Sequence, residues 1–161
     1  MSRYDFNIYT DGSYSTAESD RTYGGFVIEG LDVELLAYTS NPLWTASRNV
    51  GGELLAVVLA LNTVKQFRVS NPDDEINVHF YYDYEGVGHW ISGAWKCKKQ
   101  LTQGYKKFVT DVIRECKLNV QWTHVNGHSG VRMNEQVDRL VTISDRRERA
   151  LDANSLVKEI A

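Results

Sequence analysis

The sequence is poor in cysteine and proline, and both shortages limit what the chain can be. Its two cysteines, Cys97 and Cys116, do not fall in the Cys/His spacing of a zinc site. We interpret both as reduced thiols, which predicts a cytoplasmic location. The two prolines each follow an asparagine, at Asn41-Pro42 and Asn71-Pro72, and predict breaks between elements of secondary structure.

Long apolar runs are also missing, so we expect neither a membrane span nor a secretory signal. The first ten residues alternate apolar and polar side chains, which is typical of a strand and unlike a signal peptide. No stretch approaches the length that a transmembrane helix needs. With 161 residues, 42% of them hydrophobic and 24% charged, the composition is that of an ordinary globular domain.

Acidic residues are missing from residues 86–110, although the whole chain carries a net charge of -3. Five lysines fall in the same stretch: Lys96, Lys98, Lys99, Lys106 and Lys107. The net charge alone does not indicate a nucleic-acid-binding protein. The uneven distribution, however, predicts one surface that faces an anionic partner.

The hydrophobic pattern predicts an α/β fold made of alternating strands and helices. We expect strands at 4–11, 23–29, 33–38, 76–82 and 118–125, and helices at 53–67, 84–92, 101–117 and 133–149. The strand–helix–strand succession predicts parallel pairing of the first, fourth and fifth strands, with the hairpin strands at one edge. Residues 1–150 form the expected domain, and 151–161 form a C-terminal tail that is either a short helix or disordered.

Four carboxylates draw attention, although each has an ordinary explanation. Asp11-Gly12 is a turn signal, and Glu53 suits the first turn of a helix. Asp83 suits the N-cap of the helix that follows it. Asp138, four residues after Asn134 on a helix, suits a solvated surface.

Their combination favours a metal site. Asp11 and Asp83 end neighbouring parallel strands, so the topology brings them together although 72 positions (83 minus 11) separate them. Glu53 begins a helix that packs near the same edge, and Asp138 is flanked by apolar positions of the last helix. Converging carboxylates repel one another unless hard divalent cations, such as Mg²⁺, lie between them.

The motifs that hold these residues resemble the ribonuclease H family, type 1. They are YTDGS at 9–13, NVGGELLAVVLAL at 49–61, YYDYEGV at 81–87 and VNGHSGVRMNEQVDRL at 125–140, in the family's order. The resemblance implies a ribonuclease H-like fold with a five-stranded mixed sheet of strand order 3-2-1-4-5, flanked by helices. It also implies an endonuclease that hydrolyses the RNA strand of RNA–DNA hybrids with two Mg²⁺ ions (or Mn²⁺), leaving 5′-phosphate and 3′-hydroxyl ends.

The resemblance assigns roles to individual residues. Asp11, Glu53, Asp83 and Asp138 would hold the metal ions, and His128 would assist proton transfer or product release. Residues in reach of the hybrid would be Ser13, Arg48, Asn49, Asn134 and a basic segment with Trp95, Lys96, Lys98 and Lys99. The alternative for the basic segment is a solvated lysine-rich loop with Trp95 in the core.

The sequence departs from the family's pattern in two places. Val50 follows Asn49 where many members have a second asparagine, and Glu85 stands where a glutamine is common. Both departures affect the contacts to the RNA strand and leave the metal ligands intact. Two other functions stay open: a junction resolvase or 3′ exonuclease of similar fold, and a silent hybrid-binding module. We expect a monomer that does not associate with membranes.

Overall fold

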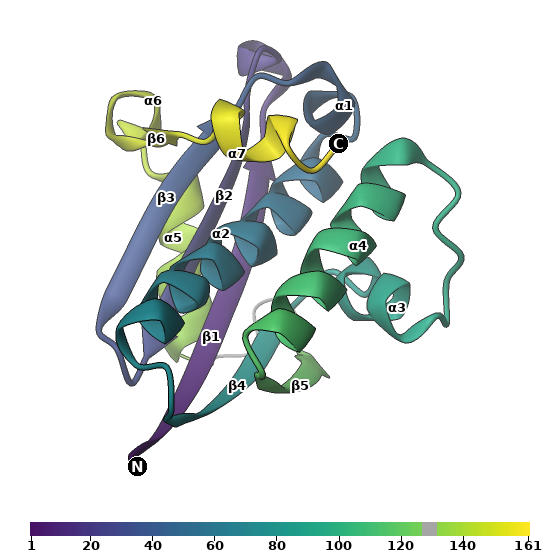
Figure 1. The fold of residues 1–161 in the computed structure, drawn as a ribbon. Helices are drawn as coiled ribbons and strands as arrows, with labels where there is room; N and C mark the ends of the chain where they lie inside the picture. The colour runs from purple at the N-terminus through teal and green to yellow at the C-terminus, as the bar shows by residue number, and fades with distance from the viewer. Residues whose placement is uncertain (127–131) are drawn as a thin grey trace.

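The computed structural model describes residues 1–126 and 132–161, and in this part of the chain a mixed sheet is covered by helices on both faces (Figure 1). The strands are β1 (Arg3–Tyr14), β2 (Thr22–Glu29), β3 (Val33–Thr39), β4 (Glu75–Tyr82), β5 (Asn119–His124) and β6 (Leu151–Asp152). Their order is β5-β4-β1-β2-β3-β6, with β1, β4 and β5 parallel to one another. The predicted order 3-2-1-4-5 is therefore confirmed, and β6 adds a short sixth strand beside β3.

The central strand β1 is longer than predicted. Its parallel pairing with β4 ends at Tyr9, but its antiparallel pairing with β2 continues to Tyr14 opposite Thr22. Asp11 therefore lies inside the strand, and the prediction that Asp11-Gly12 opens a loop is wrong. The ladder to β2 supplies the backbone hydrogen bonds that a turn would have supplied.

Helix α2 (Asn49–Ser70) fills the space in front of the sheet, where it lies beside α4 (Gln100–Glu115) in Figure 1. It begins four residues before the predicted start, and residues 51–61 are buried on all sides of the helix, whereas its C-terminal turns include exposed positions such as Gln66. With 22 residues it is long and apolar enough to cross a membrane, contrary to our expectation for the sequence. Most of it is buried in the protein, as befits a core helix.

The remaining helices are short. They are α1 (Pro42–Thr45), which the sequence did not predict, α3 (Gly86–Ser92), α5 (Arg132–Thr142), α6 (Arg146–Arg149) and α7 (Asn154–Lys158). The helix predicted at 133–149 is thus two helices, because α5 ends at Thr142. α5 lies behind the sheet in Figure 1, opposite α2. Its Val137 packs on Tyr9 and Val27, so β1 and β2 are covered on both faces.

The C-terminal tail packs against the rest of the molecule. β6 pairs with β3, and the Asn154 side chain accepts hydrogen bonds from the Thr39 hydroxyl (2.7 Å) and the Ser40 amide (2.9 Å). Val157, in α7, is fully buried in the main core. Of the two alternatives for the tail, the structure has the short helix.

Glycines let α2 approach the sheet closely. A Cβ atom on Gly12 would collide with the backbone of Gly52 and Glu53, and one on Gly52 would collide with the Tyr23 carbonyl oxygen. This close approach brings the first two turns of α2 against β1 and β2. Glycine is required at these positions because the two backbones meet there.

We expect Gly52→Ala to lower the free energy of unfolding by about 1–3 kcal/mol, the usual cost of overpacking a core. The added methyl group has no free space, so α2 must shift away from β2. The measurement is urea unfolding, with Gln66→Ala on an exposed position of the same helix as the control. A Gly52→Ala variant as stable as this control would show that the helix is not tightly held.

Candidate metal centre

Three of the four predicted carboxylates meet near the carboxyl ends of the parallel strands β1 and β4. Asp11, Glu53 and Asp83 each offer an oxygen, and these oxygens all lie within 4.8 Å of one another. They come from the middle of β1, the second turn of α2 and the residue that follows β4. The convergence of parallel strand ends that the sequence predicted thus brings these side chains together.

The local structure excludes the ordinary explanations for two of these residues. Helix α3 is preceded by Glu85, so Asp83 is not its N-cap. Glu53 lies in the second turn of α2 and is 6% exposed, whereas a carboxylate that only interacts with a helix dipole sits in the first turn at the surface. The positions of Asp83 and Glu53 are therefore better explained by the carboxylate cluster that they form with Asp11.

Burial and mutual repulsion make the charged forms of these carboxylates costly. Asp11 is 7% exposed, and burial, followed by the charges of Asp83 and Asp138, raises its pKa to about 7. Burial also raises the pKa of Glu53 well above its usual range, with further contributions from the charges of Asp11 and Asp83. The pKa of Asp83 is raised as well, mainly by burial of the carboxyl group. A cation between the carboxylates would reverse these shifts.

Asp138 stands beside this group without belonging to it. It is an exposed residue of α5, on the opposite side of β1 from α2, and it is not one of the three that lie within 4.8 Å. Its charge nevertheless contributes to raising the pKa of Asp11 and Asp83, so it is an electrostatic neighbour of both. The four predicted ligands therefore share one region.

The donor set fits a hard divalent cation. The backbone amide of Gly12 donates to Oδ1 of Asp11 (2.9 Å), but no described residue donates a hydrogen bond to the buried Oε2 of Glu53. A buried carboxylate oxygen without a donor is costly. Carboxylate oxygens are the ligands that Mg²⁺ and similar ions prefer.

The predicted substrate-binding residues next to the centre differ in their surroundings. Arg48 and Asn49 are exposed at the start of α2, and Arg48 has a positive φ of 53°, which is unusual for a residue with a side chain. Ser13 is engaged within the protein, because its hydroxyl accepts a hydrogen bond from Arg146 (2.7 Å). Asn134 lies half-buried in the first turn of α5.

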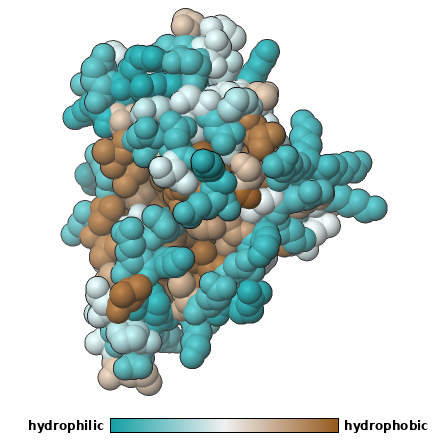
Figure 2. All heavy atoms as spheres, turned by 45° about the horizontal axis from the view of Figure 1, so that its top comes forward, coloured by the Kyte–Doolittle hydropathy of each residue, from teal (hydrophilic) through white to brown (hydrophobic). Residues whose placement is uncertain are grey.

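The basic segment forms the loop between α3 and α4. Figure 2 shows hydrophilic side chains projecting on the side of the molecule where this loop lies in Figure 1. Lys96, Lys98 and Lys99 are exposed and line a hollow that Arg48 also borders. Trp95 is 38% exposed and contacts Tyr84, His89 and Trp90, so the alternative that placed it in the core is wrong.

His128 lies outside the described residues, so its predicted role stays a prediction. The ring of His124 forms a hydrogen bond with the backbone carbonyl of Asp83 (2.8 Å) and so supports the chain where it leaves β4.

The sequence analysis missed Arg146, which contacts Ser13 and the end of α5. It sits among three arginines at 146–149, a pattern typical of a solvated surface. No sequence signal separates the buried arginine from its exposed neighbours.

Comparisons with known proteins agree with this geometry. The sequence profile of the RNase H family matches residues 3–144. A ribonuclease H of Phenylobacterium zucineum is 30% identical over 141 residues, which cover 83% of this chain and 85% of that protein. A ribonuclease HI of Vibrio parahaemolyticus is 31% identical over 140 residues, covering 83% and 84%. The structure of LC11-RNase H1 in complex with an RNA/DNA hybrid aligns with a TM-score of 0.65 at 20% identity, covering 83% of this chain and 94% of that one.

The solved structures show a ribonuclease H-like fold, and the family profile with the named relatives defines the class of enzyme, a metal-dependent endonuclease. Because the family profile spans most of the sequence, the chain belongs to the ribonuclease H family, and its relatives place it with type 1.

We expect the metal-free Asp11→Asn variant to be more stable than the wild type at pH 8, by about 1–3 kcal/mol. The folded pKa of Asp11 is raised to about 7, so the folded protein retains a proton that the unfolded chain releases near pH 4. The destabilisation by Asp11 is therefore absent below about pH 4, grows between about pH 4 and pH 7, and is complete above pH 7. Asparagine keeps the acceptor for the Gly12 amide.

Urea unfolding in EDTA at pH 4, 6 and 8 measures the difference between the two proteins. Asp73→Asn is the control, because Asp73 is exposed and precedes the first residue of β4, at the opposite end of that strand from Asp83. A stability difference for Asp11→Asn that does not change between pH 4 and pH 8 would contradict the assignment.

Proposed function

We propose that this chain is an endoribonuclease that hydrolyses the RNA strand of RNA–DNA hybrids. The observation that carries the proposal is the meeting of Asp11, Glu53 and Asp83 within 4.8 Å, in a chain of the ribonuclease H family. The hybrid bound to LC11-RNase H1 supports this substrate, since that protein shares the fold.

Asp11, Glu53, Asp83 and Asp138 would hold the metal. The unsatisfied oxygen of Glu53 and the raised pKa of Asp11 support a cation at this place. Two Mg²⁺ ions, or Mn²⁺ in their place, would activate a water molecule and stabilise the leaving oxygen, which gives 5′-phosphate and 3′-hydroxyl ends. The protein's own contribution is to hold the carboxylates on rigid elements and to exclude water from Glu53.

Polar side chains around the centre would position the RNA strand. Arg48 and Asn49 are exposed at the start of α2, where backbone amide groups also favour an anion such as phosphate. Asn134, and the backbone around Ser13, would reach the 2′-hydroxyl groups that distinguish RNA from DNA. The Ser13 hydroxyl can take part while it accepts from Arg146, because it has its own proton to donate.

The loop between α3 and α4 would contact the DNA strand. Lys96, Lys98 and Lys99 supply positive charge for phosphates, and the partly exposed ring of Trp95 offers an apolar surface for a sugar. His128 would assist proton transfer or product release.

We also propose a cytoplasmic monomer that is independent of membranes. The two cysteines are free, which suits a reducing compartment.

We expect Asp83→Asn to lower RNA cleavage by more than about 100-fold. Replacing a residue that only supports a metal ligand costs up to about 100-fold, and loss of a ligand should cost more. Binding of the hybrid should stay close to wild type, because affinity comes mainly from the polar and basic side chains. Cleavage is measured on hybrid, RNA duplex and DNA duplex with each strand labelled in turn, and binding by fluorescence anisotropy. Asp73→Asn is the control and should keep wild-type turnover.

These substrates separate the competing functions. Cleavage of the RNA strand of the hybrid alone supports the proposal. Cleavage of duplex DNA by the wild type would indicate a resolvase or exonuclease, and binding without cleavage a silent module.

We expect the triple variant Lys96→Gln, Lys98→Gln, Lys99→Gln to bind the hybrid more weakly and with a flatter salt dependence. Each lost phosphate contact reduces the slope of log K against log salt by about 0.9 on the scale of duplex DNA. A triple variant of Lys65, Lys117 and Lys158 to glutamine removes the same charge from other parts of the chain. Equal slopes for both triple variants would mean that the loop is merely solvated.

A further inference from the structure

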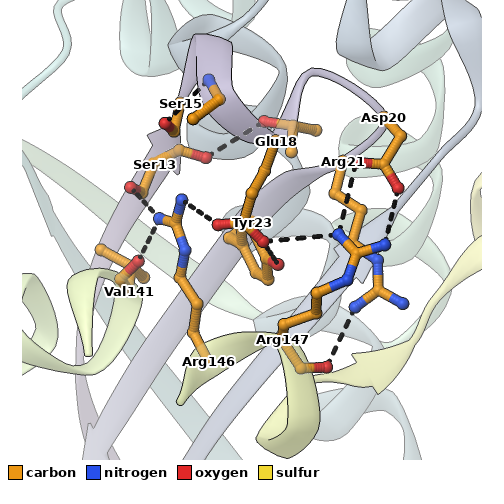
Figure 3. A network of polar contacts seen from close by, with 11 residues as sticks. Ser13, Ser15, Glu18, Asp20, Arg21, Tyr23, Val141, Arg146 and Arg147 are labelled. Carbon is orange, nitrogen blue, oxygen red and sulfur yellow. Dashed lines mark hydrogen bonds and ion pairs between the residues drawn. The ribbon is translucent and has the colours of Figure 1, made fainter. Parts of the chain in front are cut away.

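A buried arginine joins β1 to the C-terminal end of α5 (Figure 3). Arg146, in α6, is 8% exposed. Its Nη1 atom donates to the Ser13 hydroxyl (2.7 Å) and to the Val141 carbonyl (3.0 Å), and its Nη2 atom donates to Oε2 of Glu18 (3.1 Å). The guanidinium group also lies over the ring of Tyr23, 4.2 Å from its centroid.

One of these hydrogen bonds fixes the C-terminal end of α5. Val141 belongs to the last turn of this helix, where carbonyl groups have no partner within the helix. Arg146 supplies a partner for this carbonyl group. Asp138 lies one turn earlier, and its own carbonyl accepts a hydrogen bond from the Thr142 hydroxyl (2.8 Å). The part of α5 that carries Asp138 is thus held from its C-terminal side.

The other hydrogen bond reaches the strand that carries Asp11. Ser13 lies two residues after Asp11 in β1, so both side chains point to the same face of the sheet. Tyr9 points to this face as well, and it packs on Val137 of α5. Arg146 therefore joins the strand of Asp11 directly to the helix of Asp138.

Apolar packing alone fixes the position of Asp138 relative to Asp11 less closely than these hydrogen bonds do. Val137 and Val141 rest on apolar side chains of the sheet, and Gly25 leaves the space that Val141 occupies. Such contacts are not directional, so small shifts of the helix cost little. The planar guanidinium group has several donors in fixed directions. It therefore holds β1, α5 and Glu18 at set positions relative to one another.

We propose that Arg146 is a positioning residue for the metal centre, which sets where Asp138 stands relative to Asp11. The proposal rests on the assignment of Asp138 as a metal ligand under the proposed function. Arg146 touches neither metal nor substrate, and its effect passes through α5 and β1. Residues that orient metal ligands in this way typically change metal affinity by about 10- to 100-fold when they are replaced.

The test compares Arg146→Lys with Arg147→Lys. Arg147 is its neighbour in the same helix and pairs with Glu18 and Asp20, but its side chain makes no hydrogen bond to β1 or α5. Both variants keep their charge, and lysine cannot hold three acceptors in the arginine's geometry. The affinity for Mg²⁺ alone is measured by isothermal titration calorimetry without substrate, and folding is checked by thermal unfolding in EDTA.

We expect Arg146→Lys to weaken Mg²⁺ binding by about 10-fold, and Arg147→Lys to leave it within about twofold of wild type. An Arg146→Lys variant that melts at a lower temperature but binds Mg²⁺ like the wild type would overturn the proposal, since its role would then be structural. If this variant fails to fold, Ser13→Ala removes the link to β1 only. Weaker Mg²⁺ binding by Ser13→Ala then supports the proposal, and wild-type affinity overturns it.

A double-mutant cycle separates this proposal from the proposed function. If Arg146 acts through Asp138, then Arg146→Lys should cause no further loss of Mg²⁺ affinity in an Asp138→Asn background. Fully additive losses would overturn the positioning role while leaving Asp138 as a ligand. If Asp138→Asn itself binds Mg²⁺ with wild-type affinity, the ligand assignment and the positioning role are both overturned. Strand-specific cleavage of the hybrid by the wild type would still support the proposed function.

Discussion

The mutual repulsion of three clustered carboxylates, two of which are buried, is the constraint on which the rest of this structure depends. Asp11, Glu53 and Asp83 lie within 4.8 Å of one another, and burial raises the pKa of each. A fold without a metal would gain stability by separating them. The packing holds them together nonetheless, because residues 51–61 of α2 are buried and the helix meets β1 and β2 through glycines. The core thus supplies the free energy that keeps a repulsive site assembled, as expected where stability is exchanged for function.

The centre also depends on both faces of the sheet at once. α2 approaches from one face with Glu53, α5 lies on the other with Asp138, and β1 stands between them with Asp11 (Figure 1). Asp11 lies in the central strand and is paired there with Gly25 of β2, beyond the end of the pairing with β4 at Tyr9. Asp138 is exposed on α5, a helix that side-chain contacts hold in place, so the position of this proposed ligand depends on surrounding residues.

Much of this arrangement could be predicted from the sequence, because periodicity fixed the elements and their alternation fixed the parallel pairing. The meeting of Asp11 with Asp83 follows from that pairing, whereas the full strand order was what the family resemblance implied. The errors arose where tertiary contacts override local signals. Asp11-Gly12 is a turn signal, yet the ladder to β2 keeps it extended. Trp44 is fully buried and Arg146 nearly so, and no local pattern shows which aromatic or which arginine of a cluster the core will enclose. The contacts of Ser13 likewise depend on a residue 133 positions away.

The short strand β6 has a consequence for how the protein behaves among its own copies. β3 would otherwise be the edge of the sheet, with its backbone amide and carbonyl groups open to another chain. Leu151 and Asp152 pair with Ala37 and Tyr38, and the Ala153 amide donates to the Tyr38 carbonyl (2.9 Å). These few residues therefore cover part of a sheet edge that could otherwise pair with a strand of another chain. Loss of this cover would show first as edge-to-edge association and reduced solubility, well before any damage to the centre on the far side of β2.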